Sequence, residues 1–255
     1  MQLDIAGFFM SISHRILFEI VEKEVIKQNK SHQWKEDILW LCKTMIFHKP
    51  TENYIKKGKR ELFKLVPARK SLFYSSADKG LPIGNYSSQF FANVYMNKLD
   101  QYIKREIGAD HYVRYVDDFI LLHKNKNELK KFRNKIETFL NDKLGLKLHE
   151  EKTKLQSSSN GIDFLGYFIK PNYVLVRRRV VKKMKEKLND AARLPVCDRD
   201  LPAKILATVN SYLGHFKHSA SFNLRHSICK NYLGEFKEKF ILSEKCLVLK
   251  LAKKA

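Results

Sequence analysis

Two adjacent carboxylates, Asp117 and Asp118, lie between two apolar runs in the stretch YVRYVDDFILLH (Tyr112–His123). The runs are rich in β-branched and aromatic residues, which favours two strands joined by a tight turn at the acids. Like charges held together are costly unless a cation lies on them. Carboxylate oxygens on a rigid hairpin suit Mg²⁺, so the pair predicts a metal site. The alternative is a solvated Asp-Asp turn, although a turn that only reverses the chain more often holds Gly or Asn.

A third carboxylate, Asp4, ends a short predicted strand (residues 2–5) and is followed by a turn and a helix. If that strand lies beside the hairpin, Asp4, Asp117 and Asp118 meet at one edge of a sheet. Such a cluster can hold two divalent ions ~4 Å apart and catalyse an in-line phosphoryl displacement. One ion lowers the pKa of the attacking hydroxyl, and the other neutralises the triphosphate and the leaving group. Taken alone, Asp4 is equally an ordinary strand-end residue.

Apolar periodicity predicts the elements that position these acids. Helices are expected over residues 13–28 (with Ser13 as N-cap), 34–47, 87–106, 127–143, 180–192, 201–216 and 224–241. Besides the hairpin, strands are expected at 146–148, 153–156, 162–169 and 173–176, with a basic loop over 51–80. The fold class is therefore α+β, with a sheet-containing domain at residues 1–176 and a helical, basic domain at 177–255.

The charge of the chain indicates a polyanionic partner. The net charge is +22 over 255 residues, and residues 171–255 hold 19 Lys/Arg against 7 Asp/Glu. A nucleic acid is the first expectation and an anionic membrane the second. No stretch approaches the ~20 apolar residues of a spanning helix, and no signal peptide precedes Asp4. The four cysteines, far apart and without CxxC spacing, suit buried thiols in a reducing cytoplasm.

Five segments resemble the sequence boxes of reverse transcriptases, in the correct order along the chain, and a sixth resembles the thumb. LDIAGFFMSI (3–12) resembles the first catalytic box and YVDD (115–118) the metal-binding box. KGLPIGNYSSQFFANVYMNKLD (79–100) resembles the box that covers the incoming nucleotide. GLKLHEEKTKLQ (145–156) and GIDFLGYFI (161–169) resemble the boxes that close the palm, and SYLGHFKHSASFNL (211–224) resembles the thumb of bacterial, group II intron-like enzymes. The resemblance implies a palm at 1–176, a thumb at 177–255 and an RNA-directed DNA polymerase.

The resemblance also implies roles for individual residues. Asp4, Asp117 and Asp118 would be catalytic and, with the carbonyl of Ile5, would hold two Mg²⁺ ions. The expected nucleotide-binding residues are Phe9, which would exclude a ribose 2′-OH, and Ile83, Gly84, Gln89 and Lys152. Tyr115 is expected near the primer end, and phosphate contacts of template or primer are expected at Arg177, Arg178, Arg179, Lys182 and Lys183. Plainer explanations are core packing for Phe9 and Ile83 and a solvated surface for Lys152 and the charge run.

The form of the nucleotide box indicates a lineage. IGNxxSQ, with KSLF (70–73) upstream, resembles the enzymes of diversity-generating retroelements, which copy a template RNA with frequent errors opposite adenines. Ile83 stands where most bacterial relatives have Gln and cannot hydrogen-bond, so discrimination that depends on paired polar groups is lost. The expected partners are an RNA template, a DNA or RNA primer, deoxynucleoside triphosphates and a small basic accessory protein. The alternatives are a retron or group II intron-type enzyme, or a defective nucleic-acid-binding fragment.

The chain departs from the family at its start, because it begins just before the first catalytic box and the fingers region is largely missing. In relatives that region supplies basic residues that grip the triphosphate. Positioning of this kind is worth several kcal/mol, so we expect the chain on its own to polymerise poorly.

Overall fold

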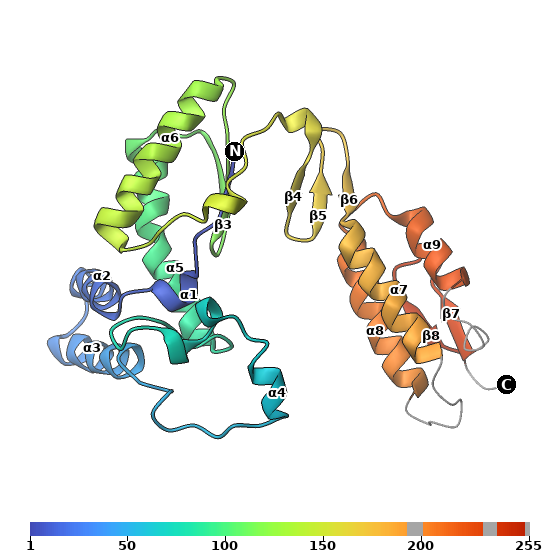
Figure 1. Cartoon of the computed structure of the whole chain (residues 1–255), viewed down its shortest axis with the longest axis horizontal. Helices are drawn as coiled ribbons and strands as arrows, with labels where there is room; N and C mark the ends of the chain where they lie inside the picture. Colours follow the sequence, from blue (N-terminus) through green and yellow to red (C-terminus); the bar gives the residue numbers. More distant parts are fainter. Residues whose placement is uncertain (193–200, 232–238, 253–255) are drawn as a thin grey trace. The chain divides into compact units, whose positions relative to one another are not determined.

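The computed structural model describes residues 1–192, 201–231 and 239–252, and the chain divides into two compact units, Met1–Leu155 and Gln156–Ala255 (Figure 1). Helices and small antiparallel sheets occur in both units, in agreement with the α+β class. The domain division expected after residue 176 falls inside the second unit. The assignment of palm and thumb stays a prediction.

A three-stranded antiparallel sheet of order β1-β3-β2 lies at the centre of the first unit. Its strands are β1 (Gln2–Leu3), β2 (His111–Tyr115) and β3 (Asp118–Leu122). Phe119 and Leu121 of β3 are fully buried, whereas Val113 and Tyr115 of β2 are half exposed. This alternation leaves one face of the sheet covered by the core and the other face open along β2.

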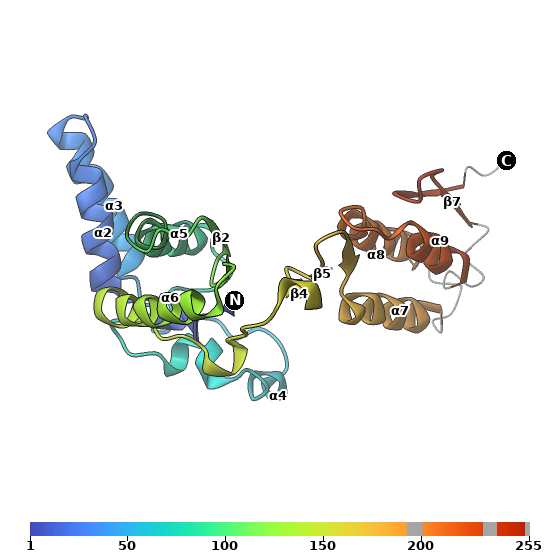
Figure 2. The same cartoon turned by 90° about the horizontal axis from the view of Figure 1, so that it is seen from above.

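Helices supply the rest of the first core. The helices α2 (His14–Ile26) and α3 (His32–Ile46) form an antiparallel pair, and α5 (Tyr86–Gln101) packs against α2 (Figures 1 and 2). The Ser13 side chain accepts a hydrogen bond from the amide of Ile16, which confirms the predicted N-cap. The helix α6 (Lys126–Phe139) follows β3, and both α5 and α6 end in a wider helical turn, η3 (Tyr102–Glu106) and η4 (Leu140–Leu144).

The short helix α1 (Phe8–Ser11) follows β1 and is hydrogen-bonded to the segment at the end of the basic loop. The carbonyl oxygens of Phe9 and Ile12 accept hydrogen bonds of 2.8 Å from the amides of Leu81 and Gly80. These bonds fix residues 80–83, just before α5, against α1. Two sequence segments that lie about seventy residues apart are therefore neighbours at the end of the sheet.

The second unit has its own core. A three-stranded antiparallel sheet is formed by β4 (Ile162–Phe164), β5 (Tyr167–Ile169) and β6 (Val174–Val176). The helices α7 (Arg178–Ala192), α8 (Leu201–Phe216) and α9 (Phe222–Asn231) and the strand pair β7 (Phe240–Leu242) and β8 (Leu249–Leu251) follow. Met184, Leu188, Val209 and Leu213 bury the facing sides of α7 and α8.

Three expectations about local structure were wrong. The strand expected over 162–169 is divided into β4 and β5, which pair with each other as an antiparallel hairpin. Residues 146–148 and 153–156 form no strands. Within them, Leu148 makes an isolated bridge to Ile5 and Lys154 one to Gln2. The one-turn helix η5 (Glu150–Lys152) lies between the two bridges. The helix expected over 224–241 does not extend to its end, since residues 240–242 alternate between buried and exposed as a strand does.

The loop expected over 51–80 is present and contains short helical turns: α4 (Arg60–Phe63), η1 (Ala68–Lys70) and η2 (Leu72–Tyr74). Of the cysteines, Cys229 and Cys246 are buried free thiols and Cys42 is a partly buried one, whereas Cys197 lies outside the described residues. In the described part of the chain, no helix is long and apolar enough to cross a membrane.

A buried ion pair ties β2 to α5. The Arg114 guanidinium donates two hydrogen bonds, of 2.8 and 2.6 Å, to the Asp100 carboxylate, which also accepts one of 2.7 Å from the Tyr112 hydroxyl. The Asp100 and Arg114 side chains are only 20% and 10% exposed. Burial, and then the Asp100 charge, raise the pKa of the Tyr112 hydroxyl, so it stays a donor.

We expect Asp100→Ala to lower the free energy of unfolding by about 3–5 kcal/mol, because it leaves the Arg114 charge buried without its partner. Urea denaturation of the purified chain measures the change. Asp110→Ala removes an exposed carboxylate near the same strand and should cost under about 0.5 kcal/mol. Equal losses in the two variants would contradict the assignment.

Candidate active site

The turn between β2 and β3 carries the two adjacent acids. Tyr115 pairs with Asp118, so the turn consists of Val116 and Asp117, and Asp118 is already the first residue of β3. Val116 has a φ of +56°. A β-branched residue pays about 1–3 kcal/mol for this left-handed conformation, which persists only where the surroundings enforce it.

Arg114 is part of what enforces the turn. Its Nη1 donates a hydrogen bond of 2.9 Å to the Val116 carbonyl, while its other nitrogens hold Asp100 on α5. The guanidinium therefore links the strained turn to a buried helix. This role of Arg114 and Asp100 was not predicted from the sequence, where its one signal was a charged residue, Arg114, inside an apolar strand.

Strand pairing brings Asp4 to the same place. Leu3 pairs with Phe119, so the next position in this antiparallel register sets Asp4 opposite Asp118. Side chains directly opposite in such a pair have Cβ atoms about 4.5–5.5 Å apart. The backbone of Asp4 is fixed on its other side as well, because its carbonyl accepts a hydrogen bond of 2.8 Å from the His149 amide. Ile5 follows as a buried residue that bridges to Leu148.

The Asp4 carboxylate is buried but only half satisfied. The residue is 5% exposed, and its Oδ2 accepts a hydrogen bond of 2.7 Å from the Lys152 ammonium. Its Oδ1 is buried and has no hydrogen-bond donor among the described residues. A buried anionic oxygen without a partner costs free energy, so this atom is suited to contact a cation.

The neighbouring acids show the same demand for positive charge. Burial, and then the charge of Asp4, raise the pKa of Asp118 to about 6. Burial also raises the pKa of Asp117, and the charge of Asp4 adds to that rise, while the ammonium groups of Lys152 and Lys70 oppose it. Because the pKa values of Asp117 and Asp118 are raised, a divalent ion would compete with protons for these two carboxylates.

The donors fit Mg²⁺ in chemical type, since they are hard carboxylate oxygens on a strand end and a tight hairpin. In the described part of the chain, no three or more His, Cys, Asp or Glu side chains stand arranged so that they could hold a metal ion. The Lys152 ammonium forms an ion pair of 2.7 Å with one of the Asp4 carboxylate oxygens. Ion binding would require Lys152 to leave that oxygen.

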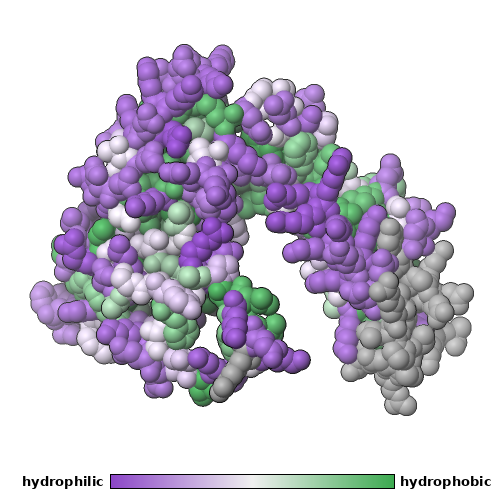
Figure 3. All heavy atoms as spheres, in the orientation of Figure 1, coloured by the Kyte–Doolittle hydropathy of each residue, from purple (hydrophilic) through white to green (hydrophobic). Residues whose placement is uncertain are grey.

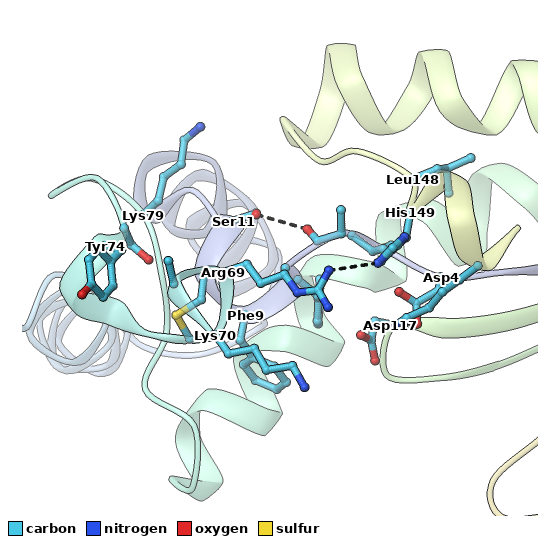
Figure 4. A pocket seen from close by; sticks show the side chains of 18 of the residues that line it. Asp4, Phe9, Ser11, Arg69, Lys70, Tyr74, Lys79, Asp117, Leu148 and His149 are labelled. Atoms are coloured by element: carbon cyan, nitrogen blue, oxygen red, sulfur yellow. Dashed lines mark hydrogen bonds and ion pairs between the residues drawn. The ribbon is translucent and has the colours of Figure 1, made fainter. Parts of the chain in front are cut away.

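A pocket of about 900 Å³ opens beside the acids. Figure 4 shows Asp4 and Asp117 at one end, and Arg69 and Lys70 extending toward them from the opposite wall. Lys152 and His149 belong to the lining on the acidic side, and the Arg69 Nη1 lies 3.4 Å from the His149 Nε2. The pocket therefore combines carboxylates that could hold cations with cations that could hold an anion.

The pocket brings together some of the predicted nucleotide-binding residues and not others. Phe9 and the 64%-exposed Ile83 line it, as does Lys152. Gly84, at a φ of +108° before α5, and the exposed Gln89 are not among its lining residues. Exposure excludes core packing as the explanation of Ile83, whereas Phe9 is partly packed against the core and makes an edge-to-face contact with Phe8.

The remaining predicted residues lie on open surfaces. Tyr115 is 58% exposed on the open side of β2. In the second unit, α7 buries Met184 and Leu188 and exposes a basic face formed by Arg178, Arg179, Lys182 and Lys183. Figure 3 shows hydrophilic surface over this helix. Arg177, just before α7, forms an ion pair of 3.2 Å with Asp163, so it is partly neutralised.

Comparison with known proteins identifies the relatives of this chain. The family model described as reverse transcriptase (RNA-dependent DNA polymerase) matches residues 1–169, which include all three acids. The group II intron-encoded protein LtrA of Lactococcus lactis is 37% identical over 84 residues, which are 32% of this chain and 14% of LtrA. Protein YkfC of Escherichia coli is 24% identical over 196 residues, 64% of this chain and 45% of YkfC.

Among solved structures, telomerase from Candida albicans, in complex with a fragment of telomeric RNA, is similar with a TM-score of 0.42 and 13% identity. The match covers 91% of this chain and 44% of that one. This chain thus spans less than half the length of each of these relatives.

The raised pKa of Asp118 predicts how stability depends on pH. Between the ordinary value of 3.8 and about 6, the folded protein binds more protons than the unfolded chain, so stability falls as pH rises through this range. Asp118→Asn removes the effect. In metal-free buffer we expect the variant to exceed the wild-type Tm by about 2–4 °C above pH 6 and to match it near pH 4.

Thermal unfolding recorded from pH 4 to 8 with a chelator measures this difference. The control is Asp142→Asn, which changes an exposed carboxylate remote from the acids. A difference in Tm between Asp118→Asn and wild type that is the same at every pH would contradict the prediction.

Proposed function

Because the chain belongs to the reverse transcriptase family, we propose that it acts as an RNA-directed DNA polymerase. Its substrates are an RNA template, a DNA or RNA primer, and deoxynucleoside triphosphates. The observation that carries the proposal is the register that sets Asp4 opposite Asp118, at the hairpin that bears Asp117. The first unit would serve as palm, and the helical part of the second as thumb.

In the proposed reaction the primer 3′-oxygen attacks the α-phosphorus of the nucleotide. The bond between the α-phosphorus and the bridging oxygen breaks, and pyrophosphate leaves. Asp4, Asp117 and Asp118, with the carbonyl of Ile5, would hold two Mg²⁺ ions, which when bound stabilise the charge on the attacking and leaving oxygens. Raised pKa values at Asp117 and Asp118 mean that these ligands lose their protons more completely as pH rises.

The other residues would bind and orient the substrates. The ring of Phe9 lines the pocket beside the acids, where it would meet the sugar and exclude a 2′-hydroxyl. Lys152 would exchange its contact with Asp4 for the leaving pyrophosphate once ions neutralise that carboxylate. The basic face of α7 would bind phosphates of the template and primer, in a contact that weakens as salt rises.

Within the family, we assign the chain to the diversity-generating retroelements, where copying is error-prone opposite adenines and a small basic accessory protein takes part. The support is Ile83 in the IGNxxSQ segment, which presents an apolar side chain to the pocket where a hydrogen-bonding residue would constrain the nucleotide. A retron or group II intron-type lineage is the alternative.

We expect Asp117→Asn to lower the rate of Mg²⁺-dependent nucleotide addition about a thousandfold, since a metal ligand contributes several kcal/mol to the transition state. Single-nucleotide extension of a primer on an RNA template, at protein concentrations above that of the primer, measures the rate. Asp110→Asn changes an exposed acid outside the pocket and should leave the rate unchanged.

Affinity for template–primer should stay within about twofold in both variants, because the acids act on the reaction and not on duplex binding. Absence of any Asp117-dependent addition by the wild-type chain, with duplex binding retained, would refute the polymerase and favour a nucleic-acid-binding fragment.

For the lineage, we expect Ile83→Gln to reduce misincorporation opposite template adenines several-fold, because the amide restores a polar contact that constrains the nucleotide. Sequencing of cDNA made from a template with equal numbers of each base measures the error spectrum. Leu65→Gln, at an exposed apolar residue outside the pocket lining, is the control. A wild-type error rate that is equal at all four bases would exclude the assignment.

A further inference from the structure

The pocket wall opposite the acids belongs to a segment to which neither the sequence analysis nor the proposed function gives a role. Arg69 and Lys70 are two of the three residues of the one-turn helix η1, and both line the pocket. They come from the stretch between the first catalytic segment and the nucleotide-box segment. Figure 4 shows both side chains pointing along the pocket toward Asp4 and Asp117.

The helix η1 is held in place by the backbone around it. Its start is closed by a hydrogen bond of 2.9 Å from the Lys70 amide to the Pro67 carbonyl. Gly7, at a φ of +55°, leaves room for the Arg69 carbonyl, since a Cβ at that position would come within 3.3 Å of it. The two cations are therefore presented by a turn packed against the start of α1, on a defined side of the pocket.

Neither cation has a carboxylate partner in the described part of the chain. Arg69 contacts the His149 ring at 3.4 Å, and no ion pair within 4 Å involves Arg69 or Lys70. Lys70 acts on Asp117 through its charge without contacting it. The guanidinium and the ammonium face the carboxylates across an open pocket without contacting them. The space between suits an anion that meets these two groups at one end and carries bound cations, for the carboxylates, at its other end.

We propose that Arg69 and Lys70 bind the β- and γ-phosphates of the incoming nucleoside triphosphate. A metal-bound triphosphate has the matching arrangement, because its α-phosphate end would meet the ions at the acids and its terminal phosphates would meet η1. This inference rests on the proposed function. It assigns to η1 the grip on the triphosphate that the sequence analysis expected the chain to lack.

The test compares Arg69→Gln/Lys70→Gln with wild type in the full chain. We expect the Kd for magnesium tripolyphosphate, measured by calorimetry, to rise about ten- to a hundredfold, since two charge-assisted contacts are lost. The Kd for a deoxynucleoside monophosphate should change by less than about twofold, because it lacks the terminal phosphates. Glutamine keeps the backbone contacts of η1, and circular dichroism checks folding.

The matched control is Lys57→Gln/Lys59→Gln, which removes the same charge from exposed residues of the same segment outside the pocket lining. It should leave tripolyphosphate affinity within about twofold of wild type. Arg69→Lys should keep part of the tripolyphosphate affinity, because the positive charge remains. It should not keep all of it, because an ammonium lacks the two-pronged geometry of the guanidinium.

Two results would overturn the inference: tripolyphosphate affinity equal in the double variant and wild type, or affinity for a single-stranded oligonucleotide that falls by the same factor. The second would make Arg69 and Lys70 contacts of the nucleic-acid backbone. Failure of the proposed function can be told apart from failure of this inference. If the wild-type chain shows no Asp117-dependent nucleotide addition, but Arg69→Gln/Lys70→Gln still weakens tripolyphosphate binding, the anion site stands and the polymerase does not. Conversely, nucleotide addition with an unchanged KM in that variant removes only the η1 assignment.

Discussion

The structure of the first unit depends on the placement of three carboxylates within a partly buried corner of one small sheet. The β1–β3 register sets Asp4 opposite Asp118, and the β2–β3 turn adds Asp117 beside them. Such crowding is unfavourable without positive charge. Its cost is visible in the raised pKa values of Asp117 and Asp118 and in the unpartnered Oδ1 of Asp4. Lys152 offsets part of it with an ion pair of 2.7 Å. A fold that only needed a hairpin would have no reason to keep this arrangement.

The surrounding structure holds the corner in place through a small number of polar contacts. Asp100 on α5 fixes Arg114, and Arg114 holds the carbonyl of Val116, whose backbone is strained. On the other side, the amide of His149 holds the backbone of Asp4. Arg114 and Val116 are only two positions apart, but the contacts of Arg114 with Asp100 and of His149 with Asp4 join different elements. The position of the acids therefore depends on several elements of the unit being folded together. This dependence is expected of a site that must hold its ligands within fractions of an ångström.

The pocket beside the acids has two chemically different ends, and this asymmetry favours a substrate that is itself two-sided. Carboxylates at one end attract cations, while Arg69 and Lys70 at the other end attract anions. A nucleotide whose phosphates carry Mg²⁺ meets both demands at once. Phe9 and Ile83 also line the pocket and contribute apolar surface to it. The family to which the chain belongs makes this combination chemically coherent, since its members join nucleotides by displacing pyrophosphate.

The sequence by itself determined the strand–acids–strand hairpin and the helices α2, α5, α6, α7 and α8, because periodicity and charge placement are local properties of the chain. The choice of Asp4 as third acid rested on its place at a predicted strand end and on the resemblance of its segment to the first catalytic box. The family followed from the order of its sequence segments. The tertiary structure alone decided that Lys152 neutralises Asp4, that Arg114 and Asp100 support the turn, and that η1 faces the acids. It also decided that residues 146–148 and 153–156 form isolated bridges and that residues 240–242 are a strand. Most of these features depend on contacts between separate elements, from the adjacent strands β7 and β8 to Asp4 and Lys152, which are 148 positions apart. A single sequence carries no periodic signal for such contacts.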